Sequence, residues 1–237
     1  MFKKVLDVWA QHLSSTASLN ILNDQPDGWL SPKAVSAMIE TANINQVAGI
    51  SFSDIYICDP SKPWGFKSWD DLFTRKHKHG LRPVAEPSDD TVIVNPCECI
   101  LSHLQFNVSK RDKFWLKTQP YSIDDSLASL FVSGTIYQAL LSPLNYHRWR
   151  GPVAGIVKKT YKIPGTYYSQ TSSNSFVGEG PDPFAPKESQ KYCTAVATRA
   201  VVAIQADNPD IGRVVVLHVG MSEVSSCEIT VSPTNEL

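Results

Sequence analysis

The spacing of apolar residues changes after Pro83, and this change most restricts what the chain can fold into. Before it, apolar residues recur three and four positions apart, and one such set predicts an amphipathic helix: Phe2, Val5, Leu6, Trp9 and Leu13. After it, β-branched runs separated by turn residues predict strands at 91–94, 104–108, 155–157, 201–204 and 214–217. We therefore expect an α+β fold, with N-terminal helices followed by a mainly antiparallel β-sheet core.

Helix starts are marked by serines. Ser31 precedes Pro32, so a second helix should begin with Ser31 as its cap and Pro32 at its first helical position. Ser68 predicts the start of another helix, which we expect to end near Gly80. A short helix is also expected at 126–130. The Ser/Gly/Pro-rich stretch 171–190 predicts a long loop.

Composition excludes several classes of protein. The 237 residues are 42% hydrophobic and 19% charged with a formal net charge of −1, which is typical of a globular chain without a global basic field for nucleic acid. One cluster is basic: Arg75, Lys76, His77, Lys78, His79 and Arg82. We interpret it as a solvated helix end, with phosphate or lipid-headgroup contact as the alternative.

The five cysteines are scattered and odd in number, so they predict free thiols in a reducing compartment. Cys97-Glu98-Cys99 has no second Cys/His pair at zinc spacing, and no metal site is expected. The first residues mix charge into an apolar run, unlike a signal peptide, and no apolar stretch approaches the roughly 18 residues of a membrane span. The expected location is cytoplasmic.

The segment 146–155 places one imidazole, His147, between two aromatic rings and two arginines, and a Gly/Pro turn follows. A histidine in such a run needs partners for both ring nitrogens, and nearby cations favour its neutral form. Residue types alone leave two readings open. The segment is either the edge of a surface strand or a functional site.

Ordered short motifs along nearly the whole chain resemble the pyruvoyl-dependent phosphatidylserine decarboxylase family. The likeness is strongest to its soluble branch, which includes the fungal tryptophan decarboxylase of psilocybin biosynthesis. The matching segments are Phe2–Trp9, Gly28–Leu30, Ser68–Arg75, Arg82–Val84, Pro120–Ser122, Tyr146–Trp149, Val153–Gly155, Ile163–Tyr168, Ala206–Asn208 and Val219–Glu228.

The resemblance implies a carboxy-lyase. Family members cut their own chain at a Gly-Ser pair, and the serine becomes a pyruvoyl group. That ketone forms a Schiff base with the substrate amine and accepts the electrons left when CO2 departs. The implied substrate is an aromatic, tryptophan-like amino acid or phosphatidylserine.

The resemblance also implies site residues. His147 matches the first His of the family's Tyr-His-Arg-x-His element, with an implied role in proton delivery. Glu98 matches an acidic residue that orients the base, and its alternative reading is a carboxylate paired with an arginine. Tyr146 and Arg150 are the implied substrate-binding residues. Arg150 replaces the family's second His, and a guanidinium cannot accept a proton from serine.

No Gly-Ser pair follows the Gly220–Glu228 segment, so the pyruvoyl group is not expected from this chain itself. We expect two parts: a helical segment at 1–45, the end of a longer helical region, and a C-terminally incomplete decarboxylase-type domain at 46–237. Expected partners are a pyruvoyl-bearing small subunit and a second copy in a homodimer. The alternative hypothesis is a truncated or degenerate homologue that only binds a ligand or an intact paralogue.

Overall fold

The computed structural model describes residues 2–42, 47–61, 63–108, 129–168, 176–177, 180–181 and 196–233. The chain forms two compact units, each built from separate stretches of sequence. Residues 1–7, 101–138 and 155–237 form the first, here called the sheet unit. Residues 8–100 and 139–154 form the second, here called the helical unit. The predicted boundary near residue 45 stays a prediction.

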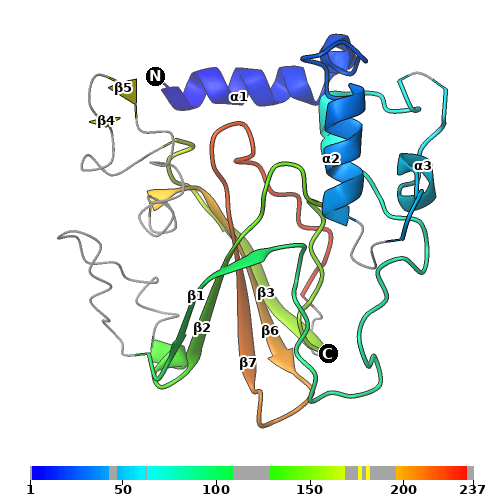
Figure 1. The fold of residues 1–237 in the computed structure, drawn as a ribbon. Coiled ribbons are helices and arrows are strands. Elements are labelled where there is room, and N and C mark those ends of the chain that lie inside the picture. Colours follow the sequence, from blue (N-terminus) through cyan, green and yellow to red (C-terminus); the bar gives the residue numbers. More distant parts are fainter. Residues whose placement is uncertain are drawn as a thin grey trace. The chain divides into compact units, whose positions relative to one another are not determined.

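The sheet unit is organised around three antiparallel strands in the order β3-β6-β7 (Figure 1). These strands are β3 (Gly155–Ile163), β6 (Arg199–Ala206) and β7 (Arg213–Val219). Val202 of the central strand pairs with Thr160 on one side and Val216 on the other. Side chains from both faces of β6 are buried, among them Val201 and Val202. The predicted strands at 155–157, 201–204 and 214–217 and the α+β fold class are therefore confirmed.

Two shorter pairs complete the described strands: β1 (Ile100–Phe106) with β2 (Thr135–Leu140), and β4 (Phe176–Val177) with β5 (Gly180–Pro181). The strand predicted at 104–108 begins earlier and ends at Phe106, because Asn107 adopts a left-handed conformation with φ 54°. Apart from β4 and β5, the expected loop 171–190 lies outside the described residues. So do 126–128 of the expected short helix, whose described part is the 3-10 helix η2 (Ser129–Phe131).

The strand predicted at 91–94 is wrong. This stretch has no strand, and Asp89 instead forms a local turn in which its carboxylate accepts from the backbone N–H of Thr91 at 2.9 Å. One backbone hydrogen bond joins 91–94 to a distant segment: the N–H of Val94 donates to the carbonyl of Pro152 at 2.8 Å. The hydrogen bond to the Asp89 side chain favours a turn here more strongly than the β-branched residues favour a strand.

The helical unit contains the C-terminal half of α1 (Phe2–Leu13), then η1 (Thr16–Ile21), α2 (Pro32–Ala42), α3 (Phe52–Ile55) and α4 (Trp69–Phe73). Ser31 caps α2, because its hydroxyl accepts from the N–H of Ala34 at 3.2 Å. Ser68 caps α4 in the same way through the N–H of Asp71 at 3.1 Å. Both predicted caps are confirmed, as is the helix at the N-terminus.

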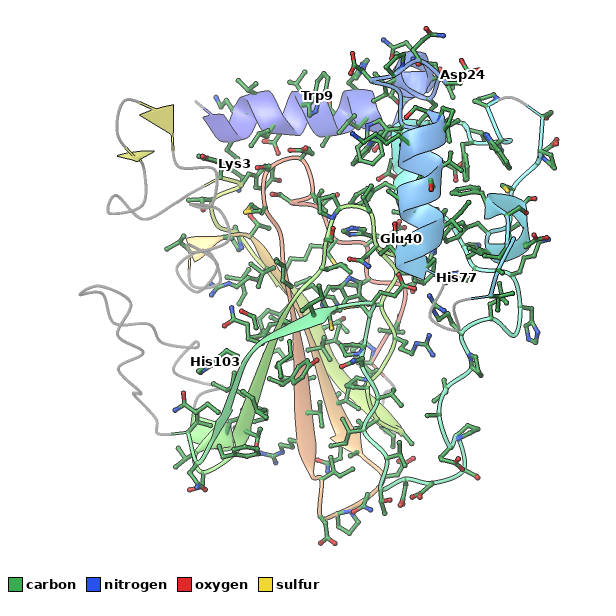
Figure 2. All side chains as sticks on the ribbon, in the orientation of Figure 1. Lys3, Trp9, Asp24, Glu40, His77 and His103 are labelled. Atoms are coloured by element: carbon green, nitrogen blue, oxygen red, sulfur yellow. The ribbon has the colours of Figure 1, made fainter. Side chains whose placement is uncertain are left out.

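Two details of these helices differ from expectation. Of the predicted apolar face of α1, Leu13 is buried, whereas Val5 and Trp9 are 60% and 45% exposed; Figure 2 labels Trp9 on this helix. The helix α4 ends at Phe73 rather than near Gly80, since both the N–H and the hydroxyl of Thr74 bond to the carbonyl of Asp70 at 2.8 Å. The chain then continues in an extended form, and His77 pairs with Tyr56 in an antiparallel bridge.

Aromatic side chains fill the core of the helical unit. Phe52 is 1% exposed and contacts the rings of Tyr56, Trp64 and Phe66. The ring of Trp69 stacks on Phe73 at a centroid distance of 4.6 Å. Burying an aromatic side chain of this size contributes about 2–3 kcal/mol, so this cluster supplies much of the unit's stability.

Candidate functional site

Glu98 lies in the loop before β1 and is the acceptor at the centre of the candidate site. Its side chain is 13% exposed. One carboxylate oxygen accepts from Nε of Arg82 at 2.9 Å and forms an ion pair with that guanidinium, and the other accepts from the N–H of Tyr146 at 3.0 Å. Burial alone would raise the pKa of Glu98, but the nearby His77 imidazole and the hydrogen bonds from Arg82 and the Tyr146 N–H outweigh it and lower the pKa to about 2.

His77 is the second buried group of this site, and the sequence did not single it out. Its side chain is 5% exposed, and Nε2 lies 3.4 Å from the nearer oxygen of Glu98. The ring lies between two tyrosines, with centroid distances of 5.0 Å to Tyr56 and 4.0 Å to Tyr146. Neither ring nitrogen has a well-aligned hydrogen-bond partner among the described residues. Figure 2 labels His77, which belongs to the helical unit.

The interpretation of the basic cluster as a solvated helix end is wrong for two of its members, Arg75 and His77. Arg75 is 3% exposed, and its guanidinium donates to the hydroxyl of Tyr56 at 3.2 Å and to the carbonyl of Leu144 at 2.7 Å. The side chain of His77 is also mostly buried, at 5% exposed, while Lys76 and Lys78 are exposed. The alternation follows from the extended backbone, which points successive side chains to opposite sides.

His147 lies against an aromatic wall. Its ring centroid is 3.9 Å from that of Phe73, and Nε2 lies 3.0 Å from the carbonyl oxygen of Ser142. A carbonyl can only accept, so Nε2 carries the hydrogen and Nδ1 carries the lone pair. Burial lowers the pKa of His147 to about 4, with the Arg75 cation adding to the effect and the Ser142 carbonyl opposing it. His147 is therefore neutral at pH 7.

Arg150 is held at the site by two backbone contacts. Its N–H donates to the carbonyl of Pro96 at 2.8 Å, and its guanidinium donates to the carbonyl of Arg82 at 3.2 Å. The four residues expected at the site therefore all belong to the helical unit. Glu98 contacts the backbone of Tyr146 directly, whereas its side-chain partners are His77 and Arg82.

A pocket of about 300 Å³ opens beside this group, within the helical unit. Tyr146, Trp149 and Arg150 contribute to its wall. Its other charged or titratable lining residues are His77, Lys78, His79, Arg82 and Arg148. None of the described residues that line the pocket is acidic, so its electrostatic character is cationic.

Cys97, directly before Glu98 in the chain, is a buried thiol near the site. Burial raises the pKa of Cys97, and the neighbouring Cys99 and Glu98 raise it further. Cys58, Cys97, Cys99 and Cys227 are free thiols. Within the stretches that the structure describes, no three His, Cys, Asp or Glu side chains come together to hold a metal ion, and no helix is long and apolar enough to cross a membrane.

Comparison with protein families places this geometry in context. A family model described as phosphatidylserine decarboxylase matches residues 69–237, which include every residue of the site. The chain belongs to the phosphatidylserine decarboxylase family. A second model described in the same terms matches residues 1–38, so the family likeness extends through α1 and into α2.

Curated relatives in this family have longer chains. Decarboxylase iboD of Amanita muscaria is 42% identical over 97% of this chain and 68% of its own length. The L-tryptophan decarboxylase of Psilocybe cubensis is 34% identical over 98% of this chain and 55% of its own length. Phosphatidylserine decarboxylase proenzyme 3 of Schizosaccharomyces pombe is 28% identical over 77% of this chain and 18% of its own length. The chain thus spans about half of the Psilocybe relative.

In this phosphatidylserine decarboxylase family member, one sequence signal points to the missed histidine. Residues 75–78 alternate Arg, Lys, His and Lys after a helix that cannot extend past Thr74. Read with a period of two, the pattern places Arg75 and His77 on the same side of an extended segment. Only the partners, Tyr56 and Glu98, could not be found from spacing.

Proposed function

We propose that this chain is the pyruvoyl-free part of a family carboxy-lyase that removes the α-carboxylate of an amino acid or of phosphatidylserine. Family membership supports the reaction class, and the named relatives include decarboxylases of both kinds. The observation that carries the proposal is His147, a neutral buried imidazole packed against Phe73. A proton-transfer group of this kind must sit at the reacting carbon of any such enzyme.

The cofactor implied by the family is a pyruvoyl group, and the residues present fit it. A ketone with its amide offers oxygen acceptors, and the described wall supplies donors: the buried His77 imidazole and the guanidinium of Arg150. When bound, the group supplies the electron sink that makes loss of CO2 feasible. Its serine would come from a segment other than the described residues.

His147 is proposed to move a proton at Nδ1. With Nε2–H directed to the Ser142 carbonyl and a pKa of about 4, the ring carries its lone pair on Nδ1 at neutral pH. It is therefore prepared to accept a proton first and to deliver it afterwards. Phe73 covers one face of the ring and keeps water from that side.

Glu98 is proposed to act as a positioning residue. By accepting from the N–H of Tyr146, the carboxylate fixes the backbone directly before His147. Its low pKa keeps it ionised, so this hydrogen bond is charge-assisted across the neutral range. Glu98 thereby restricts where the imidazole can point without touching the substrate.

Tyr146 and Arg150 are proposed to bind the substrate. Both line the pocket, and the arginine fork can hold a carboxylate through two parallel hydrogen bonds. We favour an aromatic, tryptophan-like amino acid, because the Tyr-His-Arg-Trp run follows the soluble branch of the family and aromatic rings line the pocket at Tyr146 and Trp149. A pyruvoyl-bearing small subunit and a homodimer are the proposed partners.

A second candidate, a non-catalytic homologue that binds a ligand or an intact paralogue, is favoured by Arg150. This guanidinium stands where the family has a histidine and cannot act as the base of self-cleavage. If cleavage needs that base, the protein keeps a binding site but acquires no pyruvoyl group.

The proposed function is tested by measuring CO2 released from tryptophan and from phosphatidylserine. The chain alone should release none. A longer protein, in which the chain is followed by a family segment carrying the Gly-Ser pair, should release CO2, and His147→Ala should abolish it. Turnover by the chain alone, or full activity of the His147→Ala protein, would contradict the proposal.

The role of Arg150 is tested in the same longer protein. Arg150→His restores the family residue and should accelerate self-cleavage, which intact-mass measurement follows directly. An unchanged cleavage rate would show that Arg150 does not limit processing. Absence of cleavage in both proteins would favour the non-catalytic candidate.

A further inference from the structure

The pocket of the helical unit carries more positive charge than one substrate carboxylate can balance. Four of its lining residues are permanently cationic and two more are histidines. The cations are Lys78, Arg82, Arg148 and Arg150. No lining residue in the described part of the chain is acidic, so the excess is not neutralised from within the wall.

Two of these cations, Arg148 and Arg150, have no carboxylate within ion-pair distance among the described residues, whereas the charge of Lys78 acts on the Asp54 carboxylate. Arg82 is paired with Glu98. The described acceptors of the other guanidiniums are neutral: Arg148 donates to the carbonyl of Thr74 at 2.6 Å, and Arg150 donates to the carbonyl of Arg82 at 3.2 Å. These contacts orient the two guanidiniums but leave their charge uncompensated.

His77 adds an unsatisfied polar group to the same wall. Its side chain is only 5% exposed and Nε2 faces the Glu98 carboxylate at 3.4 Å, but Nδ1 has no partner and no well-aligned hydrogen bond reaches either nitrogen in the described structure. A buried polar atom left without a partner costs about 1–3 kcal/mol, and such atoms are rare unless a water or ligand completes them. Nδ1 of His77 is therefore a polar atom of the pocket wall that a bound molecule could complete.

The wall is also held in place before any ligand arrives. The N–H of Arg150 is bonded to Pro96 at 2.8 Å, and the N–H of Tyr146 is bonded to Glu98 at 3.0 Å. The ring of Tyr146 lies over that of His77 at 4.0 Å. A pre-organised site loses less entropy on binding than one that must be ordered by its ligand.

We propose that this pocket is a binding site for a small oxyanion that carries at least two negative charges, of the phosphate or dicarboxylate class. Guanidinium forks recognise both groups through paired hydrogen bonds, and the volume of about 300 Å³ lies at the small end of ligand pockets. The proposal concerns residues that the chain itself contains. Because Tyr146 and Arg150 of the proposed substrate site line the same pocket, the inference rests on that site, and the binding test below is read without turnover.

The test is calorimetric titration of the chain with inorganic phosphate, with succinate and with acetate, at one ionic strength set with NaCl. Phosphate or succinate should bind in a one-to-one ratio at least tenfold more tightly than acetate. If both dianions bind, they should compete. Equal affinity for acetate and the dianions, or no binding of either dianion, would overturn the proposal.

Variants locate the site. Lys78→Gln and Arg150→Gln should each weaken dianion binding about tenfold, which is the loss of one charge-assisted contact. Lys78 is exposed, so its variant should fold even if Arg150→Gln does not. Arg213→Gln removes an exposed cation of the sheet unit and is the matched control. An equal loss in the control, or no loss in Lys78→Gln, would contradict the assignment.

A vesicle experiment distinguishes binding of a soluble anion from binding to a lipid surface. Phosphatidylcholine vesicles with and without phosphatidic acid are sedimented with the chain. Dianion binding without vesicle binding agrees with the proposal. Binding to the acidic vesicles alone would overturn it in favour of a headgroup surface.

Discussion

The sheet unit and the helical unit are stabilised by different kinds of contact. In the first, β6 is bonded along its length to β3 and β7, and regular backbone pairing determines the structure. In the second, short helices are linked by side chains that meet across long sequence separations, such as Arg82 and Glu98. The comparison shows that a regular scaffold and an irregular site respond to different substitutions.

The largest effect is expected where a buried charge loses its partner. Glu98→Gln leaves the Arg82 guanidinium without its carboxylate and should lower the free energy of unfolding by about 3 kcal/mol. Hydrogen exchange measured by mass spectrometry should rise first at 75–82 and 96–100. Asp89→Asn, which changes an exposed carboxylate of a local turn, is the control and should have little effect. A similar response to both would show that the ion pair does not stabilise the helical unit.

The second largest loss of stability is expected from a cavity made at the central strand, β6. Val201 is fully buried in β6, and Val201→Ala should cost about 2–3 kcal/mol through lost burial and the space left behind. Exchange should rise in β3 and β7 together, because both pair with β6. Val132→Ala, at a half-exposed valine of the same unit, gives the baseline for the measurement. Exchange confined to β6 would show that the three strands do not open cooperatively.

The pH dependence of stability should report on His147. Its pKa is lowered to about 4 in the folded chain, so the folded state binds fewer protons than the unfolded state below the ordinary value of 6.5. Stability should therefore be complete above pH 6.5 and fall by about 2 kcal/mol towards pH 4, allowing for partial solvation of the ring. Urea unfolding of His147→Gln should lack this slope, whereas His79→Gln, at an exposed imidazole, should retain it.

Glu98 extends the same dependence to lower pH. Its pKa is lowered from 4.5 to about 2, so its contribution is present above pH 4.5 and is lost as pH falls towards 2. Unfolding measured across this range should steepen in the parent chain relative to Glu98→Gln. Parallel curves would show that Glu98 does not hold its charge more strongly in the folded state.

The smallest effect is expected at a helix cap. Ser68→Ala removes the acceptor for the N–H of Asp71 and should cost about 1 kcal/mol, while Ser68→Thr retains the oxygen and most of the stability. Thermal unfolding distinguishes the two variants. Equal losses would indicate that packing of the buried Ser68, rather than its cap, is what matters.

The sequence was sufficient where local rules determine the outcome. Ser31 and Ser68 start helices because a side-chain oxygen can satisfy the first N–H groups, which depends only on neighbours in the chain. The β-branched runs of β6 and β7 indicate strands for a similar reason. The strand predicted at 91–94 is wrong because the side chain of Asp89 forms a local hydrogen bond with the backbone N–H of Thr91, which favours a turn.

The site was only partly accessible from the sequence. His147 and Glu98 were singled out through the family likeness, and Glu98 indeed contacts the backbone of Tyr146. His77 was missed because its neighbours in sequence are exposed lysines, and because a partner 21 positions away leaves no mark in local spacing. Long-range side-chain pairing depends on the tertiary fold, and pattern rules do not reach it.

The protonated thiol of Cys97 makes the helical unit a chemical reporter of its own opening. Because alkylating reagents attack thiolates, a buried cysteine with a raised pKa stays unmodified while its surroundings remain closed. Cys97 directly precedes Glu98 in the chain, so an opening of this loop that carries the backbone of Glu98 away from its partners should also uncover the sulfur. The time course of iodoacetamide labelling at this one position would therefore measure how often the loop separates from its partners.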